Sequence, residues 1–241
     1  MYIRFRFKRG EELKFIGHLD ILRLFERAFK RSGLPVAHSQ GFNPRPQIVF
    51  AQPMPLGLTS GGEFADVELI GEYKTDEFIK RLNGSLPPGL QLLEAKERIN
   101  KSNLMSIIEA ARYNIGFTVG SQEKPAMDRF AESIMGKDII SVTKKTKRGE
   151  KEINIRPLIY ELTANINGNT GEFEVLLGAG QNDNVRPDLF LDGVSDVTGV
   201  RLELKYMHRL MLYVRDQGGK GVNNAEADRN VWISPLDDKV L

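Results

Sequence analysis

A row of cationic side chains is the first feature of this sequence that could do chemistry. Arg23, Arg27, Lys30 and Arg31 recur at spacings of three and four residues, so they share one face of a predicted helix. Asp20 lies in the first turn of that helix and can pair with Arg23. Such a row is either a solvated helix face or a stripe that binds phosphate groups, and both interpretations stay open at this point.

The segment after the helix is a loop with little conformational freedom. Residues 39–46 are Ser-Gln-Gly-Phe-Asn-Pro-Arg-Pro, and the two prolines fix their own φ and push the preceding residues to extended conformations. Asn43 and Arg45 precede those prolines, so they are expected to be held in place with little entropy left to lose. Rigid polar side chains on a loop suit binding better than mere connection. We therefore predict a binding surface built from the helix and this loop.

The positive charge of the chain is concentrated near this surface. The net charge is only +2 over 241 residues, yet residues 1–50 carry 10 Lys or Arg against 4 Asp or Glu. A localised basic region predicts an anionic partner, and nucleic acid is the partner favoured here. The predicted nucleic-acid-binding residues are His18, Arg23, Arg27, Arg31, Asn43, Arg45, Arg4 and Arg6, with Asp20 and Ser39 as further polar site residues.

Motifs for independent catalysis are missing from the sequence. His18, His38 and Asp20 could approach one another as metal ligands, but no pair has the three- or four-residue spacing of ligands on one helix. The sequence has no Gly-x-Ser-x-Gly elbow, no Walker-type loop and no dinucleotide fingerprint. We therefore predict no metal, no cofactor and no catalytic activity of the chain's own.

The elements that must position this surface form a first domain, predicted over residues 1–98. Apolar residues at positions 3, 5 and 7 alternate with Arg4 and Arg6, which predicts a half-buried strand with a cationic outward face. The order strand, helix, strand, strand, helix, strand is the ferredoxin-like signature of an α+β fold. After the basic helix, strands are predicted at residues 48–51, 64–70 and 90–96, with a second helix beginning at Thr75.

A second ferredoxin-like domain with an extra hairpin is predicted over residues 110–215. The pattern again runs from a strand through a helix, several strands and a second helix to a final strand, so both domains are expected to have antiparallel sheets. Asn167-Gly168-Asn169 predicts one of the hairpin turns. The polar segment that follows predicts a mobile C-terminal tail over residues 216–241.

The composition is that of a globular protein, with 41% hydrophobic and 27% charged residues. No stretch approaches the roughly 20 consecutive apolar residues of a membrane span, and the first residues lack the apolar centre of a signal peptide. We therefore expect a cytoplasmic protein with no membrane partner. The absence of cysteine excludes disulfides, thiolate catalysis and a cysteine-ligated iron–sulfur cluster in this chain.

Six short motifs follow one another in the N-terminal part of the chain. They are Phe15-x-x-His18-Leu19-Asp20, Arg27-Ala28, Leu34-Pro35, Ser39-x-Gly41-Phe42-Asn43-Pro44-x-Pro46, Phe50-Ala51 and Pro53-x-Pro55-Leu56-Gly57. Together they resemble the bacterial radical-SAM-linked proteins, which are domains fused to or encoded beside cobalamin-binding radical SAM proteins. Gly17 stands where that pattern commonly has serine, and Arg45 where it commonly has histidine.

This resemblance implies a radical SAM protein as partner and RNA modification as context. Because the chain has no cysteine, it is not itself a radical SAM enzyme. The sequence predicts a non-catalytic, RNA-binding accessory to a radical SAM enzyme system, acting in tRNA or rRNA modification. The alternative is a protein-interaction or substrate-presenting module for that partner, without nucleic-acid binding. Salt separates the two, because phosphate contacts lose affinity steeply with salt and an apolar protein interface responds weakly.

Overall fold

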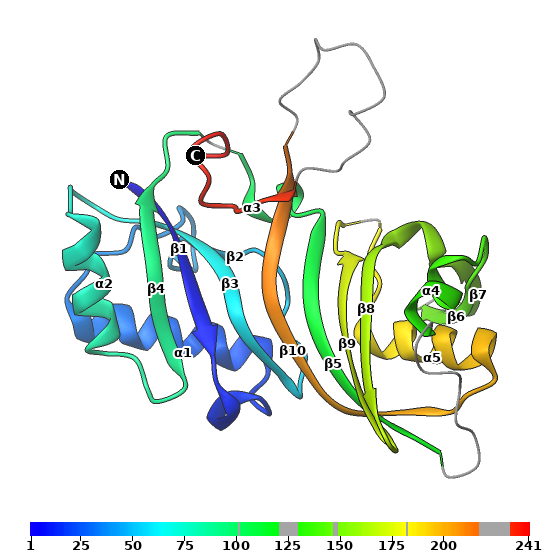
Figure 1. The fold of residues 1–241 in the computed structure, drawn as a ribbon. Coiled ribbons are helices and arrows are strands. Elements are labelled where there is room, and N and C mark those ends of the chain that lie inside the picture. Colours follow the sequence, from blue (N-terminus) through cyan, green and yellow to red (C-terminus); the bar gives the residue numbers. More distant parts are fainter. Residues whose placement is uncertain (101, 121–129, 147–148, 182, 217–231) are drawn as a thin grey trace, which may run out of the picture. The chain divides into compact units, whose positions relative to one another are not determined.

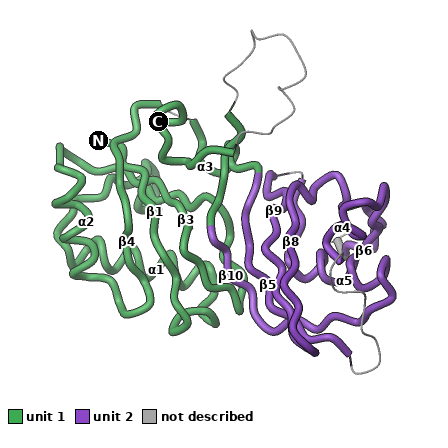
Figure 2. The backbone as a smooth tube through the Cα atoms, viewed as in Figure 1, with its two compact units in different colours: residues 1–109, 211–241 green, residues 110–210 purple. Residues whose placement is uncertain are grey.

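Helices and mostly antiparallel strands alternate along the chain, in the α+β class that the sequence predicts (Figure 1). The structure is a computed structural model that describes residues 1–241 except 101, 121–129, 147–148, 182 and 217–231. It divides into unit 1, residues 1–109 with 211–241, and unit 2, residues 110–210 (Figure 2). Among the helices that the structure describes, none is long and apolar enough to cross a membrane.

Unit 1 is built on antiparallel strands in the spatial order β4-β1-β3-β2. Along the chain, one helix connects the first strand to the second and another connects the third strand to the fourth. Both helices lie on the same face of the sheet (Figure 1). The elements are β1 (Tyr2–Arg9), α1 (His18–Ser32), β2 (Ile48–Phe50), β3 (Leu58–Glu68), α2 (Thr75–Asn83), β4 (Leu90–Glu97) and the short α3 (Leu104–Ile107).

Aromatic side chains fill the space between this sheet and its two helices. Phe5 and Phe7 of β1 are fully buried, and their ring centroids lie 5.8 and 5.0 Å from that of Phe25 on α1. Phe78 of α2 also packs against Phe5, at 5.7 Å between ring centroids. The apolar alternation of β1 therefore faces this core, as the sequence predicts, and it fixes how α1 lies on the sheet.

The opposite face of β1 is also covered, which corrects the prediction of a cationic outward face. Arg4 is fully buried: its guanidinium donates to both carboxylate oxygens of Asp66 at 2.7 and 3.0 Å, and to the carbonyl oxygen of Pro235 at 3.1 Å. Arg6 is half-buried, 3.9 Å from the carboxylate of Glu94. Pro235 lies 231 residues after Arg4, so the local alternation along β1 carries no information about this cover.

The last described residues belong to unit 1. Strand β11 (Trp232–Ile233) pairs with the end of β10 (Leu202–Arg215), and the backbone N–H of Asn100 donates to the carbonyl oxygen of Leu241 at 2.5 Å. The predicted tail over 216–241 therefore does not hold for residues 232–241, while residues 217–231 lie outside the described part of the chain.

Unit 2 has strands in the order β10-β5-β9-β8, with residues 202–210 of β10 belonging to it. Phe173 of β9 is surrounded by Phe117 of β5, Phe130 of α4 and Phe190 of α5, so both helices pack on one face of this sheet. Strands β6 and β7 form a separate two-stranded hairpin. The elements before β10 are β5 (Ala110–Val119), α4 (Phe130–Met135), β6 (Ser141–Thr146), β7 (Gly149–Asn154), β8 (Ile159–Asn167), β9 (Thr170–Gly178) and α5 (Pro187–Thr198).

Candidate nucleic-acid interface

Helix α1 presents its basic row to solvent on the side opposite the residues that it buries in the core. Ile21, Phe25 and Phe29 are buried, whereas Arg23 and Arg27 are exposed on the other side of the helix. The helix ends at Gly33, whose φ of 66° is left-handed and suits glycine. This stop turns the chain back along the helix and places the following segment beside the basic row.

A groove runs between the C-terminal half of α1 and the segment that follows it. Its volume is about 510 Å³, and its floor is apolar, formed in part by Phe29 and Leu34. Arg27 and Lys30 reach it from the helix, and His38 reaches it from the following segment. We call this the α1 groove, and its remaining lining residues are Glu26, Pro35, Val36 and Pro46.

The loop from Ser39 to Arg45 is closed at its base and exposed at its tip. The N–H of Ser39 donates to the carbonyl oxygen of Arg45 at 2.8 Å, and the N–H of Arg45 donates to Oγ of Ser39 at 3.0 Å. Asn43 and Arg45 are exposed, and Phe42 at the tip is fully exposed. The base of the loop is continuous with the α1 groove, because Pro46 pairs with His38.

The structure brings only part of the predicted set to this surface. Arg27 lines the α1 groove, and Asn43 and Arg45 lie in the adjoining loop. Arg23 is exposed but its guanidinium is 2.8 Å from the carboxylate of Asp20, which confirms that predicted pair. Arg31 instead donates to the carbonyl oxygen of Ser85 at 2.5 Å, after α2.

Two further predicted residues, Ser39 and His18, have roles in the local structure. Ser39 closes the base of its loop, as described above. His18 begins α1 and is half-buried, with its ring 5.6 Å from that of Phe50 and its Nδ1 enclosed without a hydrogen-bond partner among the described residues. Burial lowers the pKa of His18, opposed by the charge of Glu63 and assisted by that of Arg9. A neutral, enclosed imidazole is poorly suited to hold a phosphate.

Two residues contribute to the surface without being among the predicted site residues. Lys30 belongs to the basic row, but its place in the α1 groove depends on the path of the chain after Gly33. Phe42 lies in the loop motif, yet an aromatic residue between glycine and asparagine gives no periodic signal that it is exposed. The exposure of Phe42 follows only from its position at the tip of a closed loop. In the described ranges, no group of three His, Cys, Asp or Glu is placed to hold a metal ion.

The half-buried His18 predicts a pH-dependent loss of stability. Its folded-state pKa lies below the unfolded value of about 6.5, so the unfolded state takes up a proton first as pH falls. The stability present above the unfolded pKa is therefore lost as pH falls through the folded-state pKa of His18. We expect His18→Gln to reduce the difference in unfolding free energy between about pH 7.5 and about pH 5, measured by urea titration. His38→Gln, at an exposed ring, is the matched control, and an equal effect of both variants would contradict the assignment.

No curated protein matches this chain. A chain of the crystal structure of a Cbf5-Nop10-Gar1 complex is 10% identical, with a TM-score of 0.48, over 85% of this chain and 48% of that chain. A crystal structure of an unknown protein from Galdieria sulphuraria is 14% identical, with a TM-score of 0.24, over 85% of this chain and 97% of that one. The chain thus spans about half the length of the first of these, and similarities this low carry no argument about function.

A family model gives the identity of the chain at the level of family. The model matches residues 2–187, which include β1, α1, the Ser39–Arg45 loop and the α1 groove. This match covers well over half of the chain. The chain therefore belongs to the family described as an uncharacterized protein conserved in bacteria, DUF2344.

Proposed function

We propose that this chain is a non-catalytic RNA-binding accessory to a radical SAM enzyme system, acting in tRNA or rRNA modification. One observation carries the RNA-binding part: the α1 groove gathers Arg27, Lys30 and His38 beside a closed loop that exposes Phe42 and Arg45. The radical SAM part is supported by the motif resemblance between Phe15 and Gly57.

The chemistry of this surface suits a single-stranded or looped RNA segment. Cations along a groove contact the phosphate backbone, while an exposed aromatic ring offers a face on which a base can stack. The closed base of the loop holds Phe42 and Arg45 in place before RNA arrives, so less entropy is lost on binding. The proposed contacts are thus phosphates at Arg27 and Lys30 and one base at Phe42.

We also propose that both units are ferredoxin-like domains. In unit 1 the spatial order β4-β1-β3-β2 places the last strand beside the first and the third beside the second. Unit 2 has the same order, β10-β5-β9-β8, once the β6-β7 hairpin is set aside as an insertion. Two copies of one strand order support the predicted βαββαβ arrangement, with a hairpin added in the second.

A specific observation favours the protein-interaction alternative as second candidate. Phe15, Leu19 and Leu56 are each more than half exposed. The segments that carry them are adjacent, because the N–H of Gly57 donates to the carbonyl oxygen of Lys14 at 2.6 Å. Buried Arg9 fixes both segments, donating to carbonyl oxygens of residues 13, 14, 16 and 55. A small, rigid apolar surface of this kind suits docking to a protein.

Fluorescence anisotropy tests the proposed function. Labelled tRNA and a labelled ribosomal RNA fragment are titrated with the full chain at low and at moderate salt. We expect binding that weakens steeply with salt, by a log–log slope of about 0.7 to 0.9 per phosphate contact. Absence of binding to both RNAs at low salt would reject RNA binding and leave the protein-interaction alternative.

Replacing Phe42 with alanine separates the two candidates further. Because the ring is fully exposed, we expect the unfolding free energy to change by less than about 0.5 kcal/mol. Loss of one stacked base, which contributes about 1–3 kcal/mol, should weaken RNA binding by about fivefold or more. Phe15→Ala is the matched control, an exposed phenylalanine outside the α1 groove. If Phe15→Ala weakens RNA binding and Phe42→Ala does not, the stacking role of the loop is wrong.

A further inference from the structure

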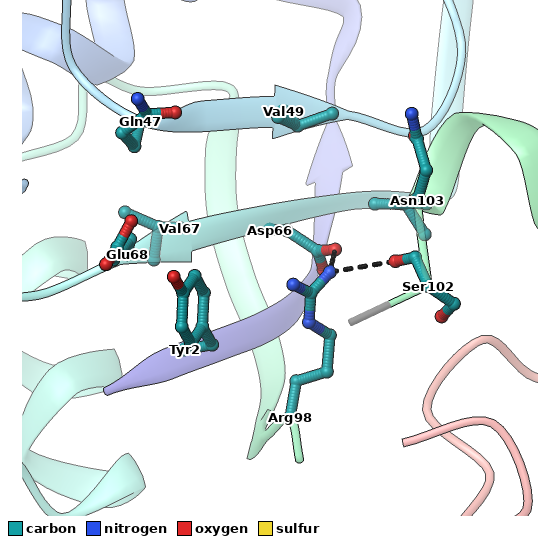
Figure 3. A pocket seen from close by; sticks show the side chains of 10 residues that line it. Tyr2, Gln47, Val49, Asp66, Val67, Glu68, Arg98, Ser102 and Asn103 are labelled. Atoms are coloured by element: carbon teal, nitrogen blue, oxygen red, sulfur yellow. Dashed lines mark hydrogen bonds and ion pairs between the residues drawn. The ribbon is translucent and has the colours of Figure 1, made fainter. Parts of the chain in front are cut away.

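A second cavity in unit 1 is lined by side chains that include Tyr2, Asp66 and Arg98 (Figure 3). Its volume is about 300 Å³, at the small end of the range for small-molecule sites. Strands β2 and β3 form one side, with Val49 on β2 and Gln47 just before it, and Arg98 with residues 102–104 forms another. Tyr2 contributes an aromatic ring, over which the Arg98 guanidinium lies at 5.3 Å.

The wall of this cavity contains a buried charge cluster that is not balanced. Asp66 accepts from two guanidiniums, Arg4 at 2.7 and 3.0 Å and Arg98 at 2.5 Å. Arg4 is fully buried, and the side chain of Arg98 is only 11% exposed. One carboxylate thus contacts two cations, so these three side chains together carry one excess positive charge, and they are largely removed from water. An uncompensated charge is unfavourable there unless an anion joins it.

The unused polar atoms at this site are hydrogen-bond donors or can act as donors. Nη1 of Arg98 donates to Asp66 and to the carbonyl oxygen of Ser102 at 3.0 Å, but its Nε is enclosed without an acceptor among the described residues. Oγ of Ser102 is likewise enclosed and unpartnered there. Asp66 accepts three hydrogen bonds, all from other guanidinium nitrogens of Arg4 and Arg98, and none from either of these two atoms. Both atoms belong to the residues that line the cavity, where Figure 3 shows Arg98 between Tyr2 and Ser102.

One other acid, Glu68, lines the cavity, and its negative charge lies at the Tyr2 end, away from Arg98 and Ser102 (Figure 3). The Tyr2 hydroxyl hydrogen-bonds to Glu68, and this interaction raises the pKa of Tyr2. The carboxylate of Glu68 is therefore held at the Tyr2 side, whereas the unpartnered donors lie at the side of Arg98 and Ser102. The cavity thus has one end suited to an anion and walls, at Val49, Val67 and Leu104, suited to an apolar body.

We infer that this cavity binds a small oxyanion, a carboxylate or a phosphate, held by Arg98 and Ser102. Arg98 supplies the charge and Ser102 a hydroxyl, in the manner of other charge-assisted anion sites. This site is separate from the α1 groove, since the two share no lining residue. Its occupant is either a free small molecule or a phosphate of a bound RNA, and both present the same oxygens.

Isothermal titration of the full chain with sodium phosphate and with sodium acetate, at constant ionic strength set by sodium chloride, tests the inference. We expect saturable binding at one site for at least one of these anions. Ser102→Ala should weaken it at least fivefold, and Arg98→Gln should abolish it. Arg112→Gln is the matched control, because Arg112 also meets two side chains, Glu161 and Glu174, but carries no unbalanced positive charge. Saturable binding that Ser102→Ala leaves unchanged, or no saturable binding of either anion, would overturn the inference.

Two further measurements keep the outcomes separate. Circular dichroism and urea unfolding show whether Arg98→Gln stays folded, and Ser102→Ala, which removes a single hydroxyl, carries the test if it does not. RNA affinity of Ser102→Ala then identifies the source of the oxyanion. Unchanged RNA affinity with weakened phosphate or acetate binding indicates a free small molecule, and a joint loss indicates an RNA phosphate. Failure of RNA binding by the wild-type chain would leave the anion titration, and this inference, standing.

Discussion

Replacing Asp66 with alanine is expected to lower the unfolding free energy by about 3–5 kcal/mol, because it leaves buried cations without their carboxylate. Arg4 is fully buried and takes both oxygens of Asp66, and Arg98 takes one of them as well. Neither guanidinium can lose its proton to escape the penalty. The cost should therefore far exceed that of an ordinary surface substitution, which is usually within about 0.5 kcal/mol.

Urea unfolding at neutral pH measures this cost, with Glu161→Ala as control. Glu161 also pairs with an arginine, Arg112, at 2.6 Å, but its side chain is half exposed. Exposed pairs of this kind contribute about 0–1 kcal/mol, so the control should unfold almost as the wild type does. Equal effects of the two substitutions would show that the Asp66 cluster is not the buried, stabilising centre described above.

Reversing the charge of the α1 groove is expected to weaken RNA binding by at least about tenfold, since two phosphate contacts are lost and replaced by repulsion. The variant is Arg27→Glu with Lys30→Glu, both exposed and both lining the groove. Their side chains make no contribution to the aromatic core under α1, so the unfolding transition should be nearly unchanged. Anisotropy with labelled tRNA at low salt measures the loss.

The matched control is Arg186→Glu with Arg201→Glu, which changes the net charge by the same amount. Both residues belong to unit 2 and are well exposed, at 63% and 82% of the side chain. A general electrostatic attraction would respond equally to both double variants. A loss confined to the groove variant supports a local site, and an equal loss in both would place RNA binding elsewhere.

Local patterns in the sequence predict the strands and helices of unit 1 well. The apolar alternation of β1 faces the core, the three- and four-residue spacing in α1 separates its buried face from its basic row, and Gly33 ends that helix. These features depend on neighbours within a few residues, which is the range over which side-chain periodicity acts. The Asp20–Arg23 pair is predicted for the same reason.

The features that the sequence does not predict depend on contacts between residues far apart in the chain. Arg4 is part of the cationic alternation of β1, but Asp66 and Pro235 bury it from positions 62 and 231 residues away. The same holds for the cavity at Arg98, which needs β1, β2, β3, Arg98 and residues 102–104 together. The spacing of residues within one segment cannot indicate which residues of a distant segment will contact it. The exposed ring of Phe42 is likewise visible only once the loop is seen to close at Ser39 and Arg45.

Site-specific photocrosslinking at position 42 tests the proposed RNA interface most directly. A photoreactive benzophenone side chain replaces Phe42, whose full exposure allows it without disturbing the fold. We expect crosslinks to labelled tRNA or ribosomal RNA that disappear with excess unlabelled RNA, with higher salt, or with Arg27→Glu and Lys30→Glu in the same chain. No crosslink at position 42, with RNA crosslinked instead from the same probe at Phe15, would contradict the assignment of the α1 groove and its loop as the RNA-binding surface.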